Sequence, residues 1–268
     1  RVIAFSEEAK ILGVSKLHID GAAHGRGNDS DGREWSTAMA VAASPGRTRV
    51  LSIGLGDGVM CDSVLQDPEV EELVIIELNG KLLDVLKQTV RGAAIASSPR
   101  VRYVNDDGRR WLNANPQEKF DLIVTFPLHP AHAGYGNLFS IEFFALVRAH
   151  LTPEGLFFAR SVDAFSTART LTEAFSDVLR VDYSGYIAKN GPIRFSAARL
   201  PFPPAEVADR VEADRATIMA NTTEAPINRD LRPHSEFYLT YPWAGYLMAT
   251  KTLYSESERS RFDGLVVP

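Results

Sequence analysis

The segment RVLSIGLGDG, residues 49–58, joins an apolar run to a turn that contains three glycines. A second apolar run follows at residues 73–77 and ends in an acid. In a Rossmann-type fold such glycines let the backbone approach a bound nucleoside or nucleotide, and the acid at the tip of the second strand accepts both ribose hydroxyls. The pattern therefore predicts a nucleoside-binding α/β fold. Its candidate binding residues are Gly54, Gly56, Gly58 and Glu77.

Asp57, inside this turn, discriminates between ligands. A dinucleotide would place its pyrophosphate on the amides of the turn, where a carboxylate repels it. Val59 also stands where the GxGxxG pattern of dinucleotide sites requires glycine. A ligand that lacks phosphate and carries a positive charge suits the turn better. The sequence therefore favours a sulfonium nucleoside of the S-adenosylmethionine type.

Composition and charge exclude several classes of protein. With 268 residues, of which 45% are hydrophobic and 24% charged, the chain can bury a large core. A net charge of -5 argues against a nucleic-acid binder, which normally carries a basic face. The single cysteine, Cys61, excludes an internal disulfide and a cysteine-rich zinc site. His129 and His132 lack neighbouring carboxylates or thiols, so we expect no metal site.

Localisation is predicted from two features that the sequence lacks. No apolar run reaches the roughly 18 residues needed to span a bilayer, and no signal-peptide pattern is present. We therefore expect a cytoplasmic protein. The chain begins with Arg1 rather than Met, so we expect a fragment or a processed chain. The presence of membrane segments in the flanking sequence is left open.

Strands and helices alternate along much of the chain. Three regions are expected. Region 1–46 contains a β-hairpin from residues 2–5 and 17–19, a loop at 21–32 and a helix at 34–43. Region 47–200 is the nucleoside-binding domain, and region 201–268 contains a helix at 205–219 and an irregular tail. In the second region we expect strands at 50–53, 73–76, 101–104, 120–125 and 156–160, helices at 57–65, 79–90, 109–113 and 140–150, and an antiparallel edge at 181–187 and 193–198. Such alternation, with strands that are apolar throughout, predicts a mostly parallel sheet covered on both faces.

Several short motifs occur in a fixed order. They are LHIDG at 17–21, GLGDG at 54–58, VIIELN at 74–79, NDDGRRWL at 105–112, FDLIV at 120–124, GNLFSIEFF at 136–144 and LTPEG at 151–155. In this order they resemble the spermidine synthases, aminopropyltransferases with a Rossmann-like fold that use decarboxylated S-adenosylmethionine. PLHP at 127–130 and NRDLRP at 228–233 resemble the large bacterial branch in which this domain is often fused to membrane segments. The resemblance covers most of the chain.

The resemblance implies roles for residues at the nucleoside site. Glu77 would accept the ribose hydroxyls as charge-assisted hydrogen bonds. Asp107, with Gly108 giving room beside it, would accept from the adenine amino group, and Asp106 is a rival for that role. Taken alone, Asp107 is explained equally well as the N-cap of the helix at 109–113.

The resemblance also implies a donor. Asp57 would face the donor's tail, where a free ammonium is favoured and the carboxylate of intact S-adenosylmethionine is not. This favours the decarboxylated donor, with methylthioadenosine as the product. His24, where the family commonly has glutamine, would hydrogen-bond the nucleoside. The family further implies a homodimer.

The acceptor site departs from the family pattern. When Pro127 and His129 are aligned, Phe126 takes the position of an aspartate that holds the attacking amine and helps remove its proton. An amine with a pKa near 10.4 is almost wholly protonated at neutral pH, so it needs a base before it can attack. The candidates for a substitute base are Thr125, His129, Tyr135 and Glu34.

Three functions remain open on the sequence. The first is a spermidine synthase-like aminopropyltransferase with an altered acceptor site, acting on a small-molecule amine such as a polyamine. The second is an S-adenosylmethionine-dependent methyltransferase of the same fold, with Phe126 in an apolar acceptor pocket. The third is a non-catalytic nucleoside-binding domain. None of the three is expected to bind nucleic acid or a metal ion.

Overall fold

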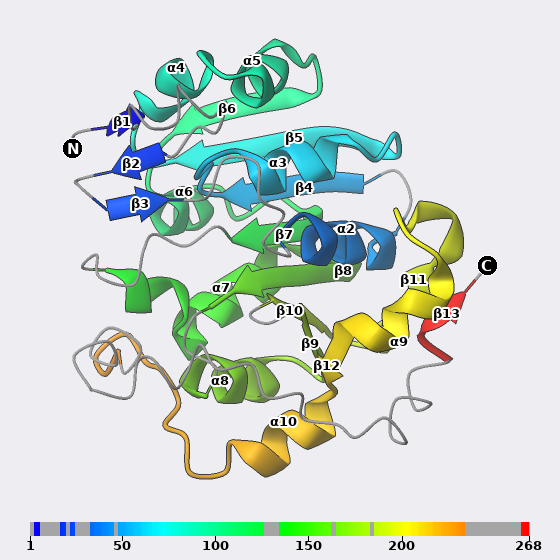
Figure 1. The fold of residues 1–268 in the computed structure, drawn as a ribbon. Coiled ribbons are helices and arrows are strands. Elements are labelled where there is room, and N and C mark those ends of the chain that lie inside the picture. The colour runs from blue at the N-terminus through cyan, green and yellow to red at the C-terminus, as the bar shows by residue number, and fades with distance from the viewer. Residues whose placement is uncertain are drawn as a thin grey trace.

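The computed structural model describes residues 3–5, 17–19, 22–24, 33–45, 48–125, 134–161, 165–182, 185–233 and 264–267. Its largest element is an eight-stranded sheet in the order β12-β9-β10-β8-β7-β4-β5-β6 (Figure 1). The strands are β4 (Thr48–Ile53), β5 (Val70–Glu77), β6 (Val101–Asn105), β7 (Phe120–Thr125), β8 (Leu151–Arg160), β9 (Asp177–Val181), β10 (Gly185–Lys189) and β12 (Val211–Ala213). The first five are parallel to one another, whereas β10 is antiparallel to β8 and to β9, and β12 is antiparallel to β9.

The parallel strands are buried on both faces. Residues 50–53 of β4 and 73–76 of β5 are at most 4% exposed, and Leu122, Ile123 and Val124 of β7 are fully buried. Continuous apolar runs of this kind are typical of strands that helices cover on both sides. The predicted mostly parallel sheet is confirmed.

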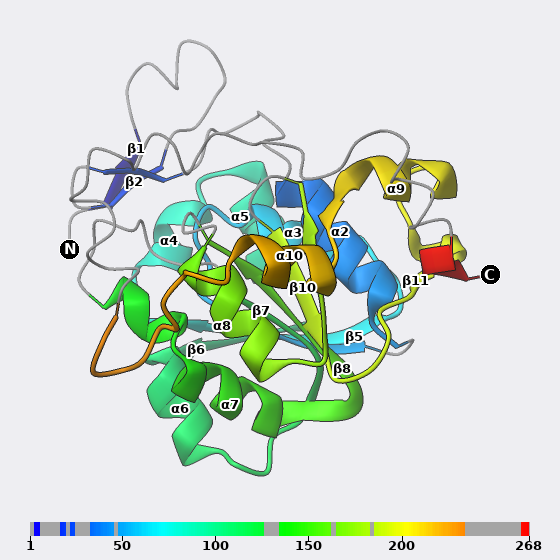
Figure 2. The ribbon, with the colours of Figure 1, turned by 90° about the horizontal axis from the view of Figure 1, so that it is seen from below.

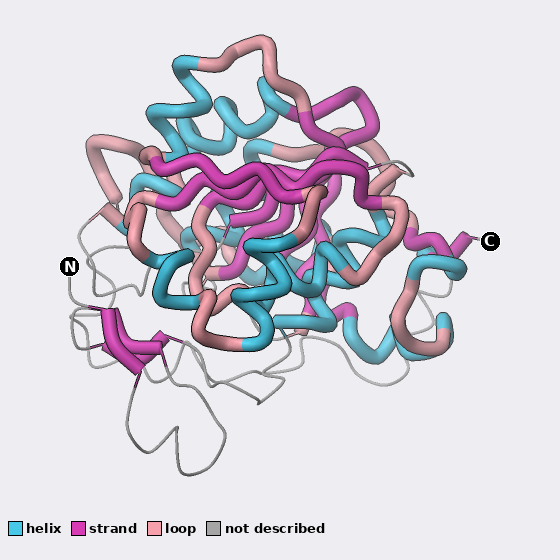
Figure 3. Tube along the Cα trace, turned by 90° about the horizontal axis from the view of Figure 1, so that it is seen from above, coloured by secondary structure: helices cyan, strands magenta, loops and turns pink. Residues whose placement is uncertain are grey.

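Helices lie against both faces of this sheet (Figures 2 and 3). They are α2 (Arg33–Ala43), α3 (Val59–Leu65), α4 (Leu82–Leu86), α5 (Val90–Ser97), α6 (Gly108–Ala114), α7 (Ile141–His150), α8 (Ser166–Ala174), α9 (Val207–Arg210) and α10 (Arg215–Asn221), with short 3-10 turns at η1 (Tyr135–Leu138), η2 (Ala197–Arg199) and η3 (Pro204–Glu206). Successive residues of β4 identify the two faces, because their side chains point to opposite sides. Ser52 accepts a hydrogen bond from Cys61 of α3, whereas Ile53 lies against Gly108 of α6.

The order of the strands indicates where a ligand is expected to bind. From β4 the sheet continues in one direction through β5 and β6, and in the other through β7 and β8. In open α/β sheets, ligands bind outside the carboxyl ends of the strands at the point where the strand order reverses. Here that point lies between Ile53 and Thr125, which are paired at the ends of β4 and β7.

A second, small sheet comes from the N-terminal residues. It consists of β1 (Ile3–Phe5), β2 (Leu17–Ile19) and β3 (Ala22–His24), paired antiparallel in that order. The expected hairpin is confirmed, but the expectation of a continuous loop at 21–32 is wrong at residues 22–24, which form the third strand. Figure 1 shows this sheet beside α4, at the edge where the parallel strands end.

The predicted single helix at 79–90 is wrong. The structure has α4, then a break at residues 87–89, and then α5. Thr89 adopts an extended conformation and caps α5, its side chain accepting the N–H of Gly92 at 3.0 Å. A threonine that caps a new helix in this way ends the preceding one, although the apolar spacing continues across it.

Two further expectations are wrong in the C-terminal half. The predicted strand at 181–187 spans the turn between β9 and β10, where Asp182 has a φ of 40°. The predicted helix at 205–219 contains β12, which extends the sheet, and Asp214 then caps α10 by accepting the N–H of Thr217. Residues 193–198 contain β11 (Phe195–Ser196), which is parallel to β13 (Val266–Val267) rather than antiparallel to its neighbours.

None of the helices that the structure describes combines the length and the apolar character needed to cross a bilayer.

Candidate functional site

The glycine turn after β4 needs glycine at three positions. Gly54, Gly56 and Gly58 have φ values of 96°, 56° and 82°, a backbone region that side chains with a Cβ atom rarely adopt. The N–H of Gly54 donates to the carbonyl of Ile76 on β5 at 2.8 Å. The turn is therefore held against the second strand at the carboxyl edge of the sheet.

Glu77 lies at the tip of β5, as the sequence predicts, and is only 7% exposed. Its Oε2 accepts the N–H of Leu55 at 2.9 Å, and its Oε1 accepts the N–H of Asn79 at 2.7 Å. Each oxygen of a carboxylate has two lone pairs, so one oxygen can accept more than one hydrogen bond. The structure thus joins Glu77 directly to the glycine turn.

Asp57 does not stand alone in the turn. Nη1 of Arg33, the first residue of α2, lies 3.0 Å from its Oδ1 and 2.9 Å from its Oδ2. The two side chains are 6% and 9% exposed, so the pair is buried. Arg33 could not be predicted as a partner of Asp57, because nothing in the local pattern of residues indicates a contact 24 positions away.

The candidate adenine residues lie at the start of α6. Asp107 is the N-cap of this helix, as one of its two predicted roles requires: its Oδ1 accepts the N–H of Arg110 at 2.8 Å. Asp106 pairs with the side chain of Arg110 at 2.5 Å. A Cβ atom on Gly108 would lie 2.5 Å from Cγ2 of Ile53, so glycine lets α6 approach the end of β4 closely. These residues follow β6, next to the strand that carries Glu77.

The structure describes the side chains of two of the candidate bases, Thr125 and Glu34. Thr125 ends β7 and is fully buried, and within the part of the chain that the structure describes its hydroxyl has no hydrogen-bond partner. Glu34 lies on α2, and its Oε1 is 3.6 Å from Nη2 of Arg91 in α5. Its carboxylate is thus paired with Arg91 rather than with a residue at the end of β7. Two further residues of the expected site, Phe126 and His129, lie outside the described residues. For the candidate base Tyr135 in η1 and for His24 in β3, only the backbone is described.

A second ion pair, which the sequence did not predict, connects three segments beside this edge. Arg109, in the first turn of α6, donates from Nη1 to Oδ1 of Asp230 at 2.8 Å and from Nη2 to Oδ2 at 2.5 Å. Nη1 also donates to the carbonyl of Asn137 in η1 at 3.1 Å. This hydrogen bonding lowers the pKa of Asp230. The NRDLRP motif contains Asp230, which explains why that segment packs here.

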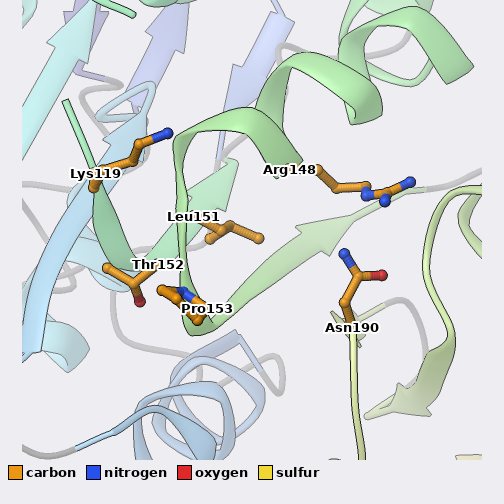
Figure 4. Close-up of a pocket in the computed structure, with 7 residues that line it drawn as sticks. Lys119, Arg148, Leu151, Thr152, Pro153 and Asn190 are labelled. Carbon is orange, nitrogen blue, oxygen red and sulfur yellow. The ribbon is translucent and has the colours of Figure 1, made fainter. Parts of the chain in front are cut away.

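Two hollows in the described residues lie away from this edge. One of about 390 Å³ is bordered by Lys119, Arg148, Leu151, Thr152 and Asn190, at the edge where the parallel strands begin. Figure 4 shows Lys119 and Arg148 on opposite sides of this hollow. The other, of about 600 Å³, lies between α2, α3 and η2. Neither is lined by the glycine turn or by Glu77.

Among the residues that the structure describes, no cluster of three or more His, Cys, Asp or Glu side chains has the arrangement of a metal site. Burial raises the pKa of the Cys61 thiol to about 12, so the thiol stays protonated at neutral pH.

Comparison with known proteins identifies relatives of this chain. Residues 33–183 match the family model described as spermine/spermidine synthase domain. A polyamine aminopropyltransferase of Mycobacterium tuberculosis (strain CDC 1551 / Oshkosh) is 30% identical over 173 residues, which is 63% of this chain and 33% of that protein. Polyamine aminopropyltransferase 1 of Pseudomonas aeruginosa is 30% identical over 159 residues, 58% of this chain and 55% of that protein. The matched part is thus a third to about half of these relatives.

The solved structures show the same fold. The crystal structure of a probable spermidine synthase from Corynebacterium glutamicum ATCC 13032 aligns with a TM-score of 0.64 at 16% identity, covering 85% of this chain and 92% of that one. Both chains therefore have the Rossmann-like fold of class I S-adenosylmethionine-dependent transferases.

Proposed function

The chain belongs to the spermine/spermidine synthase family, and from this premise we propose that it moves the aminopropyl arm of decarboxylated S-adenosylmethionine to a small-molecule amine through an altered acceptor site. The observation that carries the proposal is the link between the glycine turn and Glu77. Three glycines with positive φ bring the backbone to the carboxyl edge, and the N–H of Leu55 holds the Glu77 carboxylate there. A ribose with two adjacent hydroxyls fits such a carboxylate, because each hydroxyl can donate to one oxygen.

The neighbouring residues support an adenine subsite in this proposal. Asp107 is exposed at the start of α6, and its cap on Arg110 uses Oδ1, so Oδ2 can accept from an amino group. Gly54, Gly56 and Gly58 would border the ligand with backbone alone, and Gly108 keeps α6 close to the end of β4. Asp106 is engaged by Arg110 and is the weaker candidate, and His24 is proposed as a contact from β3.

The proposed reaction is a displacement at carbon. The lone pair of a neutral amine attacks the methylene carbon beside the sulfonium, and a new C–N bond forms as the C–S bond breaks. The electron pair of the C–S bond stays on sulfur, so methylthioadenosine leaves as a neutral thioether. The amine nitrogen then gives its extra proton to a base or to water. Holding the two reactants in line lowers the barrier even without a strong base.

The acceptor site is where this chain differs from the family pattern. Phe126 occupies the position of the expected acid, so we propose an acceptor that is less basic than a simple polyamine, or a substitute base. The buried hydroxyl of Thr125 can orient an amine by accepting its N–H, but a neutral hydroxyl is a poor base. His129 and Tyr135 remain proposed as proton acceptors, because imidazole and phenol can take part in proton transfer.

A second candidate is favoured by one specific observation. The pairing of Arg33 with Asp57 offsets the negative charge that would favour a donor with only a free ammonium. Intact S-adenosylmethionine as the donor, and methyl transfer as the reaction, therefore stay as the alternative.

The experiment that tests the proposed function measures the products. The chain is incubated with either donor and with putrescine, spermidine or a less basic amine, and the released nucleoside is identified by mass spectrometry. Amine-dependent release of methylthioadenosine from the decarboxylated donor supports aminopropyl transfer. Release of S-adenosylhomocysteine from S-adenosylmethionine supports methyl transfer. If neither product forms although the nucleoside binds, the transferase proposal is wrong and a binding domain remains.

A further inference from the structure

The hollow at the edge where the parallel strands begin has no part in the proposed function. Its volume of about 390 Å³ is in the range of small-molecule pockets. Segments far apart in the sequence form it: the residue before β7, the last turn of α7, the first residues of β8 and the residue after β10. Of the residues that border it, only Lys119 and Arg148 are charged, and both are cationic. The hollow is therefore basic, although the net charge of the chain is -5.

The donor side chains around the hollow are Lys119, Arg148 and Asn190. The Lys119 ammonium donates to the carbonyl of Ala149 in α7, which leaves further N–H groups of this ammonium for a ligand. Within the part of the chain that the structure describes, the guanidinium of Arg148 and the carboxamide of Asn190 make no hydrogen bond or ion pair, and both residues are exposed. A bound acceptor would therefore meet donors that the protein itself does not use.

The acids near the hollow have other partners. Glu154 at the start of β8 pairs with Lys189 at 2.9 Å. Asp121 uses both carboxylate oxygens for hydrogen bonds inside the protein, each at 2.9 Å. The C-terminal end of α7 adds only about half of a negative charge. Asp121 and this helix end together do not offset the two lining cations, so the hollow attracts anions.

The two cations lie on opposite sides of an apolar floor. Figure 4 shows Leu151 between Lys119 and Arg148, and Asn190 on the side of Arg148. An anion whose two charged groups are held apart by a short apolar chain matches this order. Each carboxylate then meets a cation, while the methylenes lie over Leu151. The carboxamide of Asn190 adds a donor beside the guanidinium fork.

We infer that this hollow binds a small organic dicarboxylate, with one carboxylate on Lys119 and the other on Arg148 and Asn190. The size of the hollow fits a free small molecule with a few carbon atoms between the carboxylates. The inference is independent of the proposed function, because neither the glycine turn nor Glu77 borders this hollow.

A titration followed by NMR of the nitrogen-15-labelled chain tests the inference. The ligands are succinate, glutarate and adipate, which hold their carboxylates progressively further apart. Valerate, with one carboxylate, and inorganic phosphate, a compact anion, are the comparison ligands. Ionic strength is held constant, so that screening is the same throughout. We expect the best diacid to shift the side-chain amide of Asn190 saturably. It should bind about fivefold more tightly than valerate or phosphate, the ratio that one partly exposed ion pair gives.

Variants assign this binding to the two cations. Arg148→Met and Lys119→Met each remove one positive charge and keep an apolar side chain of similar length. Each should weaken the best diacid about fivefold and bring it close to valerate. Lys87→Met is the matched control, because it removes the same charge from an exposed lysine that pairs with Asp84, away from the hollow. It should bind the diacid as the parent does.

Each outcome supports or overturns the inference. If no diacid binds more tightly than valerate, the second carboxylate has no partner and the inference is wrong. If phosphate binds as tightly as the best diacid, the hollow takes compact anions and the inference is again wrong. If Lys87→Met loses as much affinity as Arg148→Met, the binding reflects the overall charge of the chain, and the hollow is not the site.

Discussion

The backbone N–H of Leu55 donates to Oε2 of Glu77 at 2.9 Å, and this hydrogen bond joins the glycine turn after β4 to the tip of β5. The two segments are 22 residues apart in the chain. Because a buried carboxylate needs hydrogen-bond donors, this bond explains how Glu77 can be buried at the tip of β5. We propose that the ribose of a nucleoside binds beside this carboxylate.

Glu77→Ala should weaken the binding of methylthioadenosine by roughly 1.5 to 3 kcal/mol, the usual range for hydrogen bonds to a charged group. Calorimetry measures the change. The control is Glu71→Ala, an exposed residue of the same strand at the opposite edge of the sheet, which should bind as the parent does. Equal affinity in the parent and in Glu77→Ala would refute the ribose role.

Arg109 and Asp230 should be coupled energetically. In a double-mutant cycle with Arg109→Ala and Asp230→Ala, we expect a coupling of about 1 kcal/mol in the free energy of unfolding, because the pair is bidentate but partly exposed. Urea denaturation of the four proteins measures it. Strict additivity of the single changes would show that the ion pair contributes nothing.

The same pair has a predicted pH dependence. Arg109 lowers the pKa of Asp230 in the folded chain, so the stabilisation is complete above the ordinary carboxyl pKa near 4 and is lost as the pH falls through the lower folded value. The difference in stability between the parent and Asp230→Asn should therefore be constant from pH 5 to pH 7 and should shrink below about pH 4. A difference that grows on acidification would contradict this assignment.

Asp182 should act in the opposite direction. Burial raises its pKa to about 6, against the opposing effect of Arg210 and with a further increase from Glu212. Because the pKa is raised in the folded chain, the contribution of this carboxyl group to the free energy of unfolding is greatest at low pH and falls as the pH rises through 6. Relative to Asp182→Asn, the parent should lose about 1 kcal/mol between pH 4 and pH 7, after allowance for solvent screening. Asparagine tolerates the φ of 40° at this position, so the backbone is not strained.

Denaturation curves recorded for both proteins at several pH values measure this difference. Parallel stability profiles of the parent and Asp182→Asn would show that the carboxyl group does not titrate in this range.

Phe126→Asp should restore the acid that the resemblance expects. If that acid is what the chain lacks, transfer to putrescine or spermidine should rise by roughly 100-fold or more, the range of general-base assistance. The release of methylthioadenosine from the decarboxylated donor measures it, with Phe126→Asn as the uncharged control. No gain over the asparagine variant would mean that the missing acid is not the cause of the divergence.

Much of the fold could be predicted because the parallel strands are short, apolar throughout and separated by polar or glycine-rich segments. The errors occur where one polar side chain overrides a longer periodic pattern. Thr89 and Asp214 each cap a new helix, and so they end the element that the apolar spacing would continue. Asp182, with a positive φ, turns the chain inside what the sequence favoured as one strand.

The candidate site was predictable to a similar extent. Glu77 and the three glycines belong to one local pattern, and the structure joins them. Arg33 could not be found in this way, since its contact with Asp57 depends on how α2 packs against the sheet rather than on neighbouring residues. The same applies to Arg109 and Asp230, which are separated by 121 residues.

We propose that the carboxyl edge of this sheet binds a thioadenosyl nucleoside rather than a phosphorylated coenzyme. Calorimetric titration of the chain with methylthioadenosine, and separately with NAD, distinguishes the two ligands. We expect saturable binding of methylthioadenosine that Glu77→Ala weakens, and no saturable binding of NAD. Binding of NAD at least as tight as that of methylthioadenosine would refute the nucleoside assignment.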